Sequence, residues 1–313
     1  MVTEIDIANF IAKKISLSKD KADPYRRQVD TLREKLAGYI DDNPEFDLIK
    51  MLHSGSVRKG TALSTISDMD VAVYIKPDNV EGHELNEVLE YIRKALVEVY
   101  KGLMKPDQFS IGTHCVKVDF KGSGLDVDVV PVIYRGKPDD RGDLLNQDTG
   151  EWLETSIPLH LDFIRARKEL YPPYADMVRL TKWWKEQRNF KFKSFLVELI
   201  WAHLVDASSL PETGIGAFAL FLAYILRTRL QEKIIFSDYY MATEVEDDDT
   251  EVVKIYDPVN PENNVGYSIE EHLGKILEET QLAFDTVANA VHADTKSRAI
   301  EQWRRVLGES FNP

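Results

Sequence analysis

Two pairs of aspartates in the first half of the chain have the residue type and spacing that phosphate chemistry uses. Asp68 and Asp70 stand two residues apart in the segment SDMDV, and Asp126 and Asp128 do so in LDVDV. Residues two apart in a strand point to the same face, so each pair would project together, away from the apolar residues between its members. Close carboxylates repel each other, and a divalent cation removes that repulsion. The pairs therefore predict a site for two Mg²⁺ ions, the arrangement used in two-metal phosphoryl transfer.

A Gly-Ser turn, Gly55-Ser56, precedes the first acid pair. Glycine permits a tight turn at the end of a strand, and backbone amides there, together with a serine hydroxyl, can bind a phosphate. Each feature alone has a plain structural explanation, because an Asp-x-Asp pair is also the polar face of an amphipathic strand. Two pairs on two expected strands, behind one turn, favour a catalytic site.

The pattern along the chain changes from strands to helices near residue 158. An apolar stripe predicts a helix over 23–40, beginning at Asp23-Pro24, and another helix is expected at 83–100. Strands are expected at 46–53, 69–75, 114–120 and 125–134, the last two forming a hairpin. The second half predicts helices at 158–170, 174–188, 194–206, 213–232, 268–292 and 295–307.

These elements predict an α+β fold with two domains. We expect a catalytic core with its N-terminal helix at residues 1–160, a helical lobe at 161–313, and an active-site cleft between them. The 313 residues include 43% hydrophobic and 29% charged residues, which is ordinary globular composition.

Charge and cysteine content restrict the compartment and the partners. The net charge of −14 makes nonspecific binding of duplex DNA a poor default. A single cysteine, Cys115, excludes a disulfide within the chain, and its alternating apolar surroundings predict a buried small residue. We find no signal peptide, and the longest apolar run, Ile215 to Leu226, is too short to span a bilayer and predicts a core helix. We therefore expect a cytoplasmic protein without a membrane partner.

The Gly-Ser turn, the Asp-x-Asp pair and Asp128 on a following strand resemble the signature of the DNA polymerase β-like nucleotidyltransferase superfamily. Three later segments narrow the resemblance to the 2′–5′ oligoadenylate synthetases and the cGAS/DncV-like nucleotidyltransferases (CD-NTases): RLTKWW around Lys182, KSFLVEL around Ser194, and DPVNP at 257–261. The layout resembles the bacterial cyclic-oligonucleotide synthases of CBASS antiphage systems. The stretch from Gly122 to Ile164, which includes ETSIPLH at 154–160, resembles the clade that HORMA-domain proteins regulate.

The resemblance implies a polymerase β-like sheet core with an N-terminal spine helix, packed on a lobe like that of the oligoadenylate synthetases. Asp68, Asp70 and Asp128 would hold two Mg²⁺ ions, for which Mn²⁺ can substitute. The resemblance assigns the nucleotide-binding roles as follows: Gly55 and Ser56 contact the triphosphate, Lys182 neutralises the β- and γ-phosphates, Ser194 hydrogen-bonds phosphate, and Phe195, where Tyr is more usual, stacks on the donor base.

Four of these positions have alternative interpretations. Without the resemblance, Lys182 is a surface lysine and Phe195 a core residue. Asp126 is either an auxiliary acid or a solvated strand residue, and His160 either contacts the nucleotide or caps a helix. The residues leave these alternatives open.

The implied function is the joining of NTPs, with ATP favoured, into a cyclic oligonucleotide second messenger such as cyclic tri-adenylate. The implied partners are a HORMA-domain regulator, a downstream effector activated by the cyclic nucleotide, and nucleic acid only as an activator that acts with the protein partner. One alternative is a nucleotidyltransferase that tails RNA or adenylylates a protein. Another is a noncatalytic module that binds a nucleotide or a partner.

Overall fold

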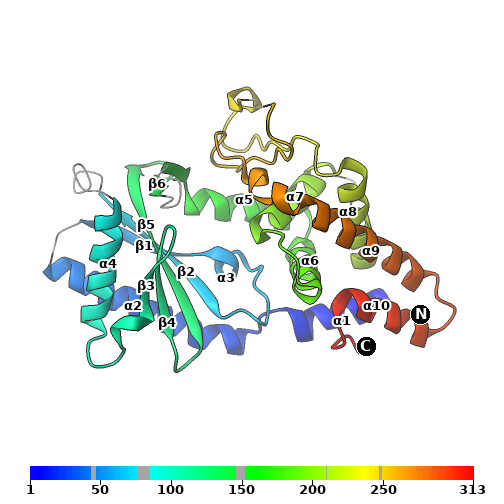
Figure 1. The fold of residues 1–313 in the computed structure, drawn as a ribbon, viewed down its shortest axis with the longest axis horizontal. Helices are drawn as coiled ribbons and strands as arrows, with labels where there is room; N and C mark the ends of the chain where they lie inside the picture. The colour runs from blue at the N-terminus through cyan, green and yellow to red at the C-terminus, as the bar shows by residue number, and fades with distance from the viewer. Residues whose placement is uncertain (44–46, 77–84, 146–151, 209, 247–248) are drawn as a thin grey trace. The chain divides into compact units, whose positions relative to one another are not determined.

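The computed structural model describes residues 1–43, 47–76, 85–145, 152–208, 210–246 and 249–313. They form two compact units (Figure 1). The sheet unit contains Leu17–Gly60 and Thr65–Asp162, and the helical unit contains Met1–Ser16, Thr61–Ser64 and Phe163–Pro313. The mixed α/β content confirms the predicted fold class, whereas the division into domains at residue 160 stays a prediction. None of the helices in the described ranges is long and apolar enough to cross a membrane.

A mixed sheet forms the centre of the sheet unit, with the strand order β1-β2-β5-β4-β3. β2 and β5 run parallel, and the other neighbours pair antiparallel. Beyond this path, β6 pairs with the end of β5, and β7 pairs with β6. The strands are β1 (Leu48–Ser54), β2 (Asp68–Ile75), β3 (Phe109–Ile111), β4 (Val116–Phe120), β5 (Leu125–Gly136), β6 (Arg141–Leu145) and β7 (Trp152–Thr155).

The strands and the β4–β5 hairpin that the sequence predicts are present. β1 begins at Leu48, while residue 46 lies outside the described residues. The strands β3, β6 and β7 were not predicted, because they have only 3, 5 and 4 residues and too little alternation to be recognised.

Two helices, α2 (Lys19–Asp42) and α4 (Leu85–Val99), pack against the sheet (Figure 1). The predicted start of the first helix at Asp23-Pro24 is wrong. Ser18 is the N-cap, since its hydroxyl accepts a hydrogen bond from the amide of Lys21, and the helix continues through Pro24. The start predicted at residue 83 lies outside the described residues, which enter α4 at Leu85.

Helices form most of the helical unit. Those predicted at 174–188 and 194–206 are confirmed as α6 (Tyr174–Arg188) and α7 (Ser194–Asp206). The others are α1 (Glu4–Phe10), a π-helical turn η1 (Ile11–Ile15), α8 (Gly214–Thr228), the 3₁₀ segments η4 (Ala242–Glu244) and η5 (Val265–His272), α9 (Leu273–Val291) and α10 (Lys296–Leu307). Helix α5 (Ile157–Leu170) begins in the sheet unit and ends in the helical unit.

Two predicted helices end or begin at other residues than expected. α8 stops at Thr228 because Arg229 and Leu230 both adopt left-handed backbone angles, with φ of 51° and 56°. The helix predicted at 268–292 is α-helical only from Leu273, after the 3₁₀ segment. The apolar run Ile215–Leu226 lies in α8 and is a core helix as predicted, with Phe218, Phe221 and Leu222 fully buried.

Candidate active site

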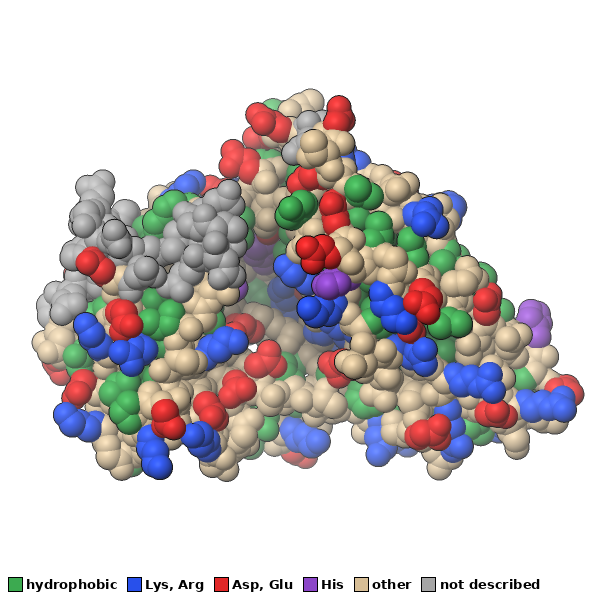
Figure 2. Space-filling view, viewed as in Figure 1, with side chains coloured by type: hydrophobic (Ala, Val, Ile, Leu, Met, Phe, Trp, Pro, Cys, Tyr) green, Lys and Arg blue, Asp and Glu red, His purple; other side chains and the backbone are tan. Residues whose placement is uncertain are grey.

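The register of the sheet brings the predicted acids together on one face. Ser54, Asp70, Asp128 and Lys117 lie opposite one another on β1, β2, β5 and β4. A second row beside them joins Asp68, Asp126 and Asp119. Met69 and Val71 of β2, and Val127 and Val129 of β5, alternate with these acids and are buried on the other face. The acids of the two rows therefore point the same way. In Figure 2, acidic side chains form a run over the sheet unit.

The Gly-Ser turn lies directly beside the first row. β1 ends at Ser54, and a short helix, α3 (Gly55–Lys59), follows at once. Gly55 has a φ of +66°, and a Cβ atom on it would lie 1.6 Å from an Oδ atom of Asp70. Only glycine lets the turn approach this carboxylate so closely. The predicted residues Gly55, Ser56 and Asp70 therefore lie within one small region.

Carboxylates crowd one another in the second row. Partial burial, followed by the charges of Asp119, Asp128 and Asp68, raises the pKa of the Asp126 carboxyl, while Lys117 opposes the increase. Asp126 itself is exposed, which fits a solvated strand residue and also leaves its carboxylate available. Carboxylates that together raise the pKa of Asp126 form an environment in which a cation binds favourably.

Lys117 and Asp119 belong to this face, although the sequence analysis did not single them out. The available signal was the alternation of 114–120, which places Val116, Val118 and Phe120 on one side and therefore these two residues on the other. Cys115, just before β4, is buried as predicted. Burial and the neighbouring Asp128 raise the pKa of its thiol to about 12, so it remains protonated.

The acid set fits a divalent metal ion that binds together with a nucleotide. Among the described residues, no three His, Cys, Asp or Glu side chains lie close enough to hold a metal ion by themselves. Mg²⁺ is commonly bound by only one or two carboxylates, with substrate phosphates and water completing the octahedron. Asp70 and Asp128 are paired next to a turn suited to phosphate, so they could hold such an ion.

A cavity of about 160 Å³ continues from the acidic row along the same face of the sheet. Gly55 and Asp70 line one end, and the floor is apolar, with Val130 and Val132 of β5 among its residues. His160 of α5 lines the cavity, as its nucleotide-contacting interpretation requires. Ser156 caps the start of α5, because its hydroxyl accepts from the amide of Leu159. An apolar floor next to acids is suited to a nucleoside placed beside its own phosphates.

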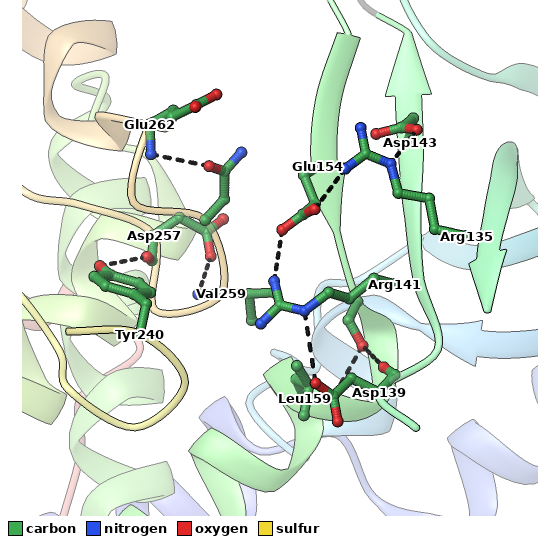
Figure 3. A network of polar contacts seen from close by, with 12 residues as sticks. Arg135, Asp139, Arg141, Asp143, Glu154, Leu159, Tyr240, Asp257, Val259 and Glu262 are labelled. Atoms are coloured by element: carbon green, nitrogen blue, oxygen red, sulfur yellow. Dashed lines mark hydrogen bonds and ion pairs between the residues drawn. The ribbon is translucent and has the colours of Figure 1, made fainter. Parts of the chain in front are cut away.

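An ion-pair network holds the strands beyond the cavity (Figure 3). Arg135 of β5 contacts both Asp143 of β6 and Glu154 of β7, and Arg141 also binds Glu154, at 2.5 Å. Ser156 donates to the carbonyl of Asp139, which ties the start of α5 to the turn before β6. The segment 154–160, which resembles the HORMA-regulated clade, therefore holds the start of α5, the helix that carries His160.

The helical unit has its own buried loop at 257–261, also shown in Figure 3. An Asp257 carboxylate oxygen accepts from the amide of Val259, and the Tyr240 hydroxyl donates to the Asp257 carbonyl. Asn260 accepts from the amide of Glu262. Asp257 and Asn260 are only 4% and 5% exposed, so the DPVNP segment is a rigid internal turn.

The remaining predicted residues, Lys182, Ser194 and Phe195, lie on α6 and α7 of the helical unit. The alternative of a surface lysine is wrong, because Lys182 is only 6% exposed and its ammonium donates to the Thr61 carbonyl at 3.0 Å. The Thr61 hydroxyl in turn donates to Glu198, which is also buried. The Thr61 carbonyl thus gives the buried ammonium a hydrogen-bond partner in place of water.

Ser194 and Phe195 begin α7. Phe195 is half-buried and packs against the core of the unit, in agreement with its core interpretation, and its stacking on a base stays a prediction. The Ser194 hydroxyl accepts a hydrogen bond from Lys185 at 3.0 Å. Lys185 is not among the residues predicted from the sequence, although its spacing of three residues from Lys182 places both lysines on one side of α6.

Comparison with known proteins identifies the relatives of this chain. Residues 1–167 match the model of the Second Messenger Oligonucleotide or Dinucleotide Synthetase (SMODS) domain. The chain is 44% identical to the cyclic AMP-AMP-AMP synthase of Escherichia coli strain MS 115-1, over 97% of this chain and 96% of that protein. It is 30% identical to the CBASS oligonucleotide cyclase CdnC of E. coli strain KTE188, over 99% and 98% of the two chains.

Solved structures agree with this relationship. E. coli MS115-1 CdnC, solved with ATP and in complex with HORMA-deltaN, superposes with a TM-score of 0.87 in both cases. The sequence identity is 42%, and the match covers 100% of this chain and 99% of that one. The resemblance inferred from the sequence is thereby confirmed, and enzymes of this kind normally use divalent metal ions. The chain belongs to the SMODS family of CD-NTases, the nucleotidyltransferases that make cyclic oligonucleotides in CBASS antiphage defence.

Proposed function

We propose that this chain joins ATP molecules, in preference to other NTPs, into cyclic tri-adenylate. A ribose hydroxyl of one nucleotide attacks the α-phosphorus of the next, pyrophosphate leaves, and a final attack within the linear trimer closes the ring. The observation that carries the proposal is the row of Asp70 and Asp128 beside the Gly55 turn. The identity of 44% to a cyclic AMP-AMP-AMP synthase supports ATP as the substrate and the trimer as the product.

In this proposal the acids of the sheet unit hold Mg²⁺, with Mn²⁺ as a substitute. Asp68, Asp70 and Asp128 are the protein ligands, and bound metal would supply charge neutralisation and activation of the attacking hydroxyl. Gly55 and Ser56 bind phosphate oxygens at the turn. Because one set of residues can serve each transfer, the same site joins and cyclises the nucleotides.

The helical unit contributes the other nucleotide-binding residues. Lys182 binds the β- and γ-phosphates, Ser194 donates to phosphate, and Phe195 stacks on the donor base. The Lys182 ammonium donates to the Thr61 carbonyl at 3.0 Å, which holds this cation in a defined position on α6. We retain the division into a catalytic core at 1–160 and a helical lobe at 161–313 as part of this proposal.

A HORMA-domain protein is the proposed regulator, because the related CdnC was solved in complex with HORMA-deltaN. The enzyme would work in the cytoplasm with low basal activity that rises with this partner, and nucleic acid would act only together with it. The product would then activate a downstream effector.

Mass spectrometry of the reaction product tests the proposal. The protein, with and without its HORMA partner, is incubated with labelled ATP and Mg²⁺ in the presence of RNA and protein acceptors. The mixture is then treated with phosphatase. We expect a phosphatase-resistant cyclic trimer, which EDTA abolishes and added Mg²⁺ or Mn²⁺ restores. Label found only on RNA or on protein would instead indicate tailing or adenylylation, and no turnover in any mixture would indicate a binding module.

A variant of the acid pair links that product to the site. Replacing both Asp68 and Asp70 with Asn removes the charge-matched metal ligands and keeps the side-chain shape, so turnover should fall by at least about 10³-fold, the order expected when charge stabilisation of the transition state is lost. Circular dichroism and thermal unfolding should remain those of the wild type. Turnover that survives in a folded variant places the active site elsewhere.

A further inference from the structure

Lys185 lies on α6, one turn after Lys182, and its side chain is half-buried. Its ammonium donates to the carbonyl of Phe192 at 2.6 Å and to the hydroxyl of Ser194 at 3.0 Å. Phe192 lies in the connection between α6 and α7, and Ser194 is the first residue of α7. The lysine therefore ties the end of one helix to the start of the next, at the residue predicted to meet a phosphate.

The charge of Lys185 lacks a carboxylate partner. Within the described part of the chain, no Asp or Glu oxygen lies within 4.0 Å of this ammonium. Neighbouring cations on the same helix are paired: Arg179 with Asp176 and Arg188 with Glu279. A half-buried cation that is bound only by neutral oxygens is able to accept an anion.

The electrostatic surroundings agree with that description. Burial, and next the positive charge of Lys182, lower the pKa of Lys185 to about 8. Glu186 on the same helix and Glu198 on α7 act in the opposite direction but do not cancel the decrease. The ammonium is therefore destabilised in the protein without ligand, and an anion beside it would restore its charge.

The hydrogen bond to Ser194 also determines what that hydroxyl can do. A serine hydroxyl has one proton to donate and two lone pairs to accept with. Because Lys185 supplies the proton of their shared bond, the proton of Ser194 remains available to another acceptor. A phosphate oxygen, which only accepts, completes such an arrangement.

We propose that Lys185 binds the triphosphate of the donor nucleotide, contacting a phosphate oxygen directly and orienting the Ser194 hydroxyl to donate to the same group. The inference rests on the proposed function and adds a second cation to the phosphate site of Lys182. It also explains why a lysine, whose pKa is readily shifted, occupies this position beside a second positive charge.

Binding would then depend on pH in a specific direction. A phosphate oxygen raises the pKa of Lys185 above its value of about 8 in the free protein, so binding takes up a proton at higher pH. Below pH 8 the free protein already has the ammonium, and above pH 8 it loses it. Affinity should therefore fall as the pH rises beyond 8, by up to about tenfold per pH unit. The phosphates of ATP do not contribute, since their last ionisation, at about pH 6 to 7, is complete by then.

Calorimetric titration with α,β-methylene ATP and Mg²⁺ tests the inference, because this analogue cannot be cleaved at the reacting bond. The wild type is compared with Lys185→Met, Lys185→Arg and Lys191→Met from about pH 7 to about pH 9.5. Lys191 is exposed and two residues before Lys193, so its replacement makes the same change of charge outside the proposed site.

We expect Lys185→Met to lose affinity by about tenfold or more at pH 7 and to show no decrease above pH 8, because a charge-assisted bond is lost. Lys185→Arg should keep the affinity and also lose the decrease, since arginine remains charged throughout. Lys191→Met should match the wild type in both respects. Thermal unfolding of each variant identifies a loss of fold.

Two results overturn the inference alone: wild-type affinity in Lys185→Met, or a wild-type decrease above pH 8 in folded Lys185→Arg. In either case the wild type still binds the analogue and still makes the cyclic product, so the proposed function stands. If the wild type, with its HORMA partner, neither binds the analogue nor turns over ATP, the proposed function fails and this inference fails with it.

Discussion

Gly55 is the residue whose side chain, a single hydrogen, the site requires most directly. The Gly55→Ala variant would place a methyl group 1.6 Å from an Asp70 carboxylate oxygen, at a left-handed φ of +66°. The carboxylate or the turn must move by an ångström or more, and a displacement of this size commonly costs about 10²-fold in rate. We expect turnover to fall by at least that factor, with a loss of stability of about 1 kcal/mol. Initial rates and denaturant unfolding measure the two effects.

The Gly38→Ala variant is the matched control. Gly38 is exposed on α2, and a Cβ atom there would have no neighbour within 4 Å. Alanine should stabilise this helix by about 0.5–1 kcal/mol and leave turnover unchanged. Equal rates in the two alanine variants would contradict the close approach of Gly55 to Asp70.

The position of a single side chain can be predicted when it depends only on residues that are close in the sequence. The spacing of two between Asp68 and Asp70 fixes a shared face as soon as a strand forms, and the sequence alone establishes it. Lys117 acquires its place only through its pairing with Asp128 across two strands, and Lys185 only through a turn that returns Ser194 to it. Such contacts depend on tertiary packing, which local patterns do not contain.

At the scale of elements, Arg167 connects three parts of the helical unit. It lies on α5, is 5% exposed, and binds Asp206 at the end of α7 and Asp238 in the loop after α8. Its guanidinium also lies 3.8 Å from the centre of the Phe163 ring. Both carboxylates remain partly exposed, so the arginine provides most of the buried charge of this cluster.

Replacement of this arginine should destabilise the protein strongly. In Arg167→Met two carboxylates lose their shared cation, and removal of one partner of a buried pair costs about 3–5 kcal/mol, of which we expect the lower end because these acids keep water contact. The Arg298→Met variant breaks an exposed pair with Asp294 and should cost less than about 1 kcal/mol. Denaturant unfolding of both variants measures the difference, and similar losses would show that Arg167 has no special role.

Long elements were predicted better than short ones. α6 and α7 extend over enough turns for an apolar pattern to fix both ends, whereas β3, β6 and β7 depend on neighbouring strands for their hydrogen bonds. The start of α2 in the structure is set by its capping residue. Pro24 is typical of a first helical turn, but the hydroxyl of Ser18, five residues before Asp23, caps α2 and sets its true start.

At the scale of the whole molecule, the chain passes between the two units four times. Residues 1–16, 61–64 and 163–313 belong to the helical unit, and residues 17–60 and 65–162, which alternate with them, belong to the sheet unit. The N-terminal segment contributes Ile7, Phe10, Ile11 and Ile15 to the helical core. Phe10 contacts the rings of Trp183 and Phe311, with centroids 6.1 and 5.0 Å away.

A division of the sequence into two consecutive halves cannot predict this interleaving, because residues 1–16 resemble any short amphipathic segment. The predicted boundary at 160 follows the change from strands to helices. The packing instead requires two distant segments, one of them the loop of Thr61 and Leu63, to complete the second half. The sequence therefore predicts where the helices lie better than it predicts which residues cover them.

A fragment of residues 161–313 should accordingly fail to fold on its own. It lacks five buried apolar side chains of its core, those of Ile7, Phe10, Ile11, Ile15 and Leu63. Burial of such side chains contributes about 1.5–3 kcal/mol each, so their loss is comparable to the whole stability of an ordinary domain, about 5–15 kcal/mol.

We expect this fragment to bind the dye ANS, to lose the near-ultraviolet circular dichroism of its tryptophans, and to unfold without cooperativity. Joining residues 1–16 to the fragment through a flexible Gly-Ser linker restores four of the five side chains and should recover a cooperative transition. The same linker preceded by a scrambled version of residues 1–16 is the control. Cooperative unfolding of 161–313 alone would mean that the helical unit is complete without its N-terminal segment, because only a packed core gives such a transition.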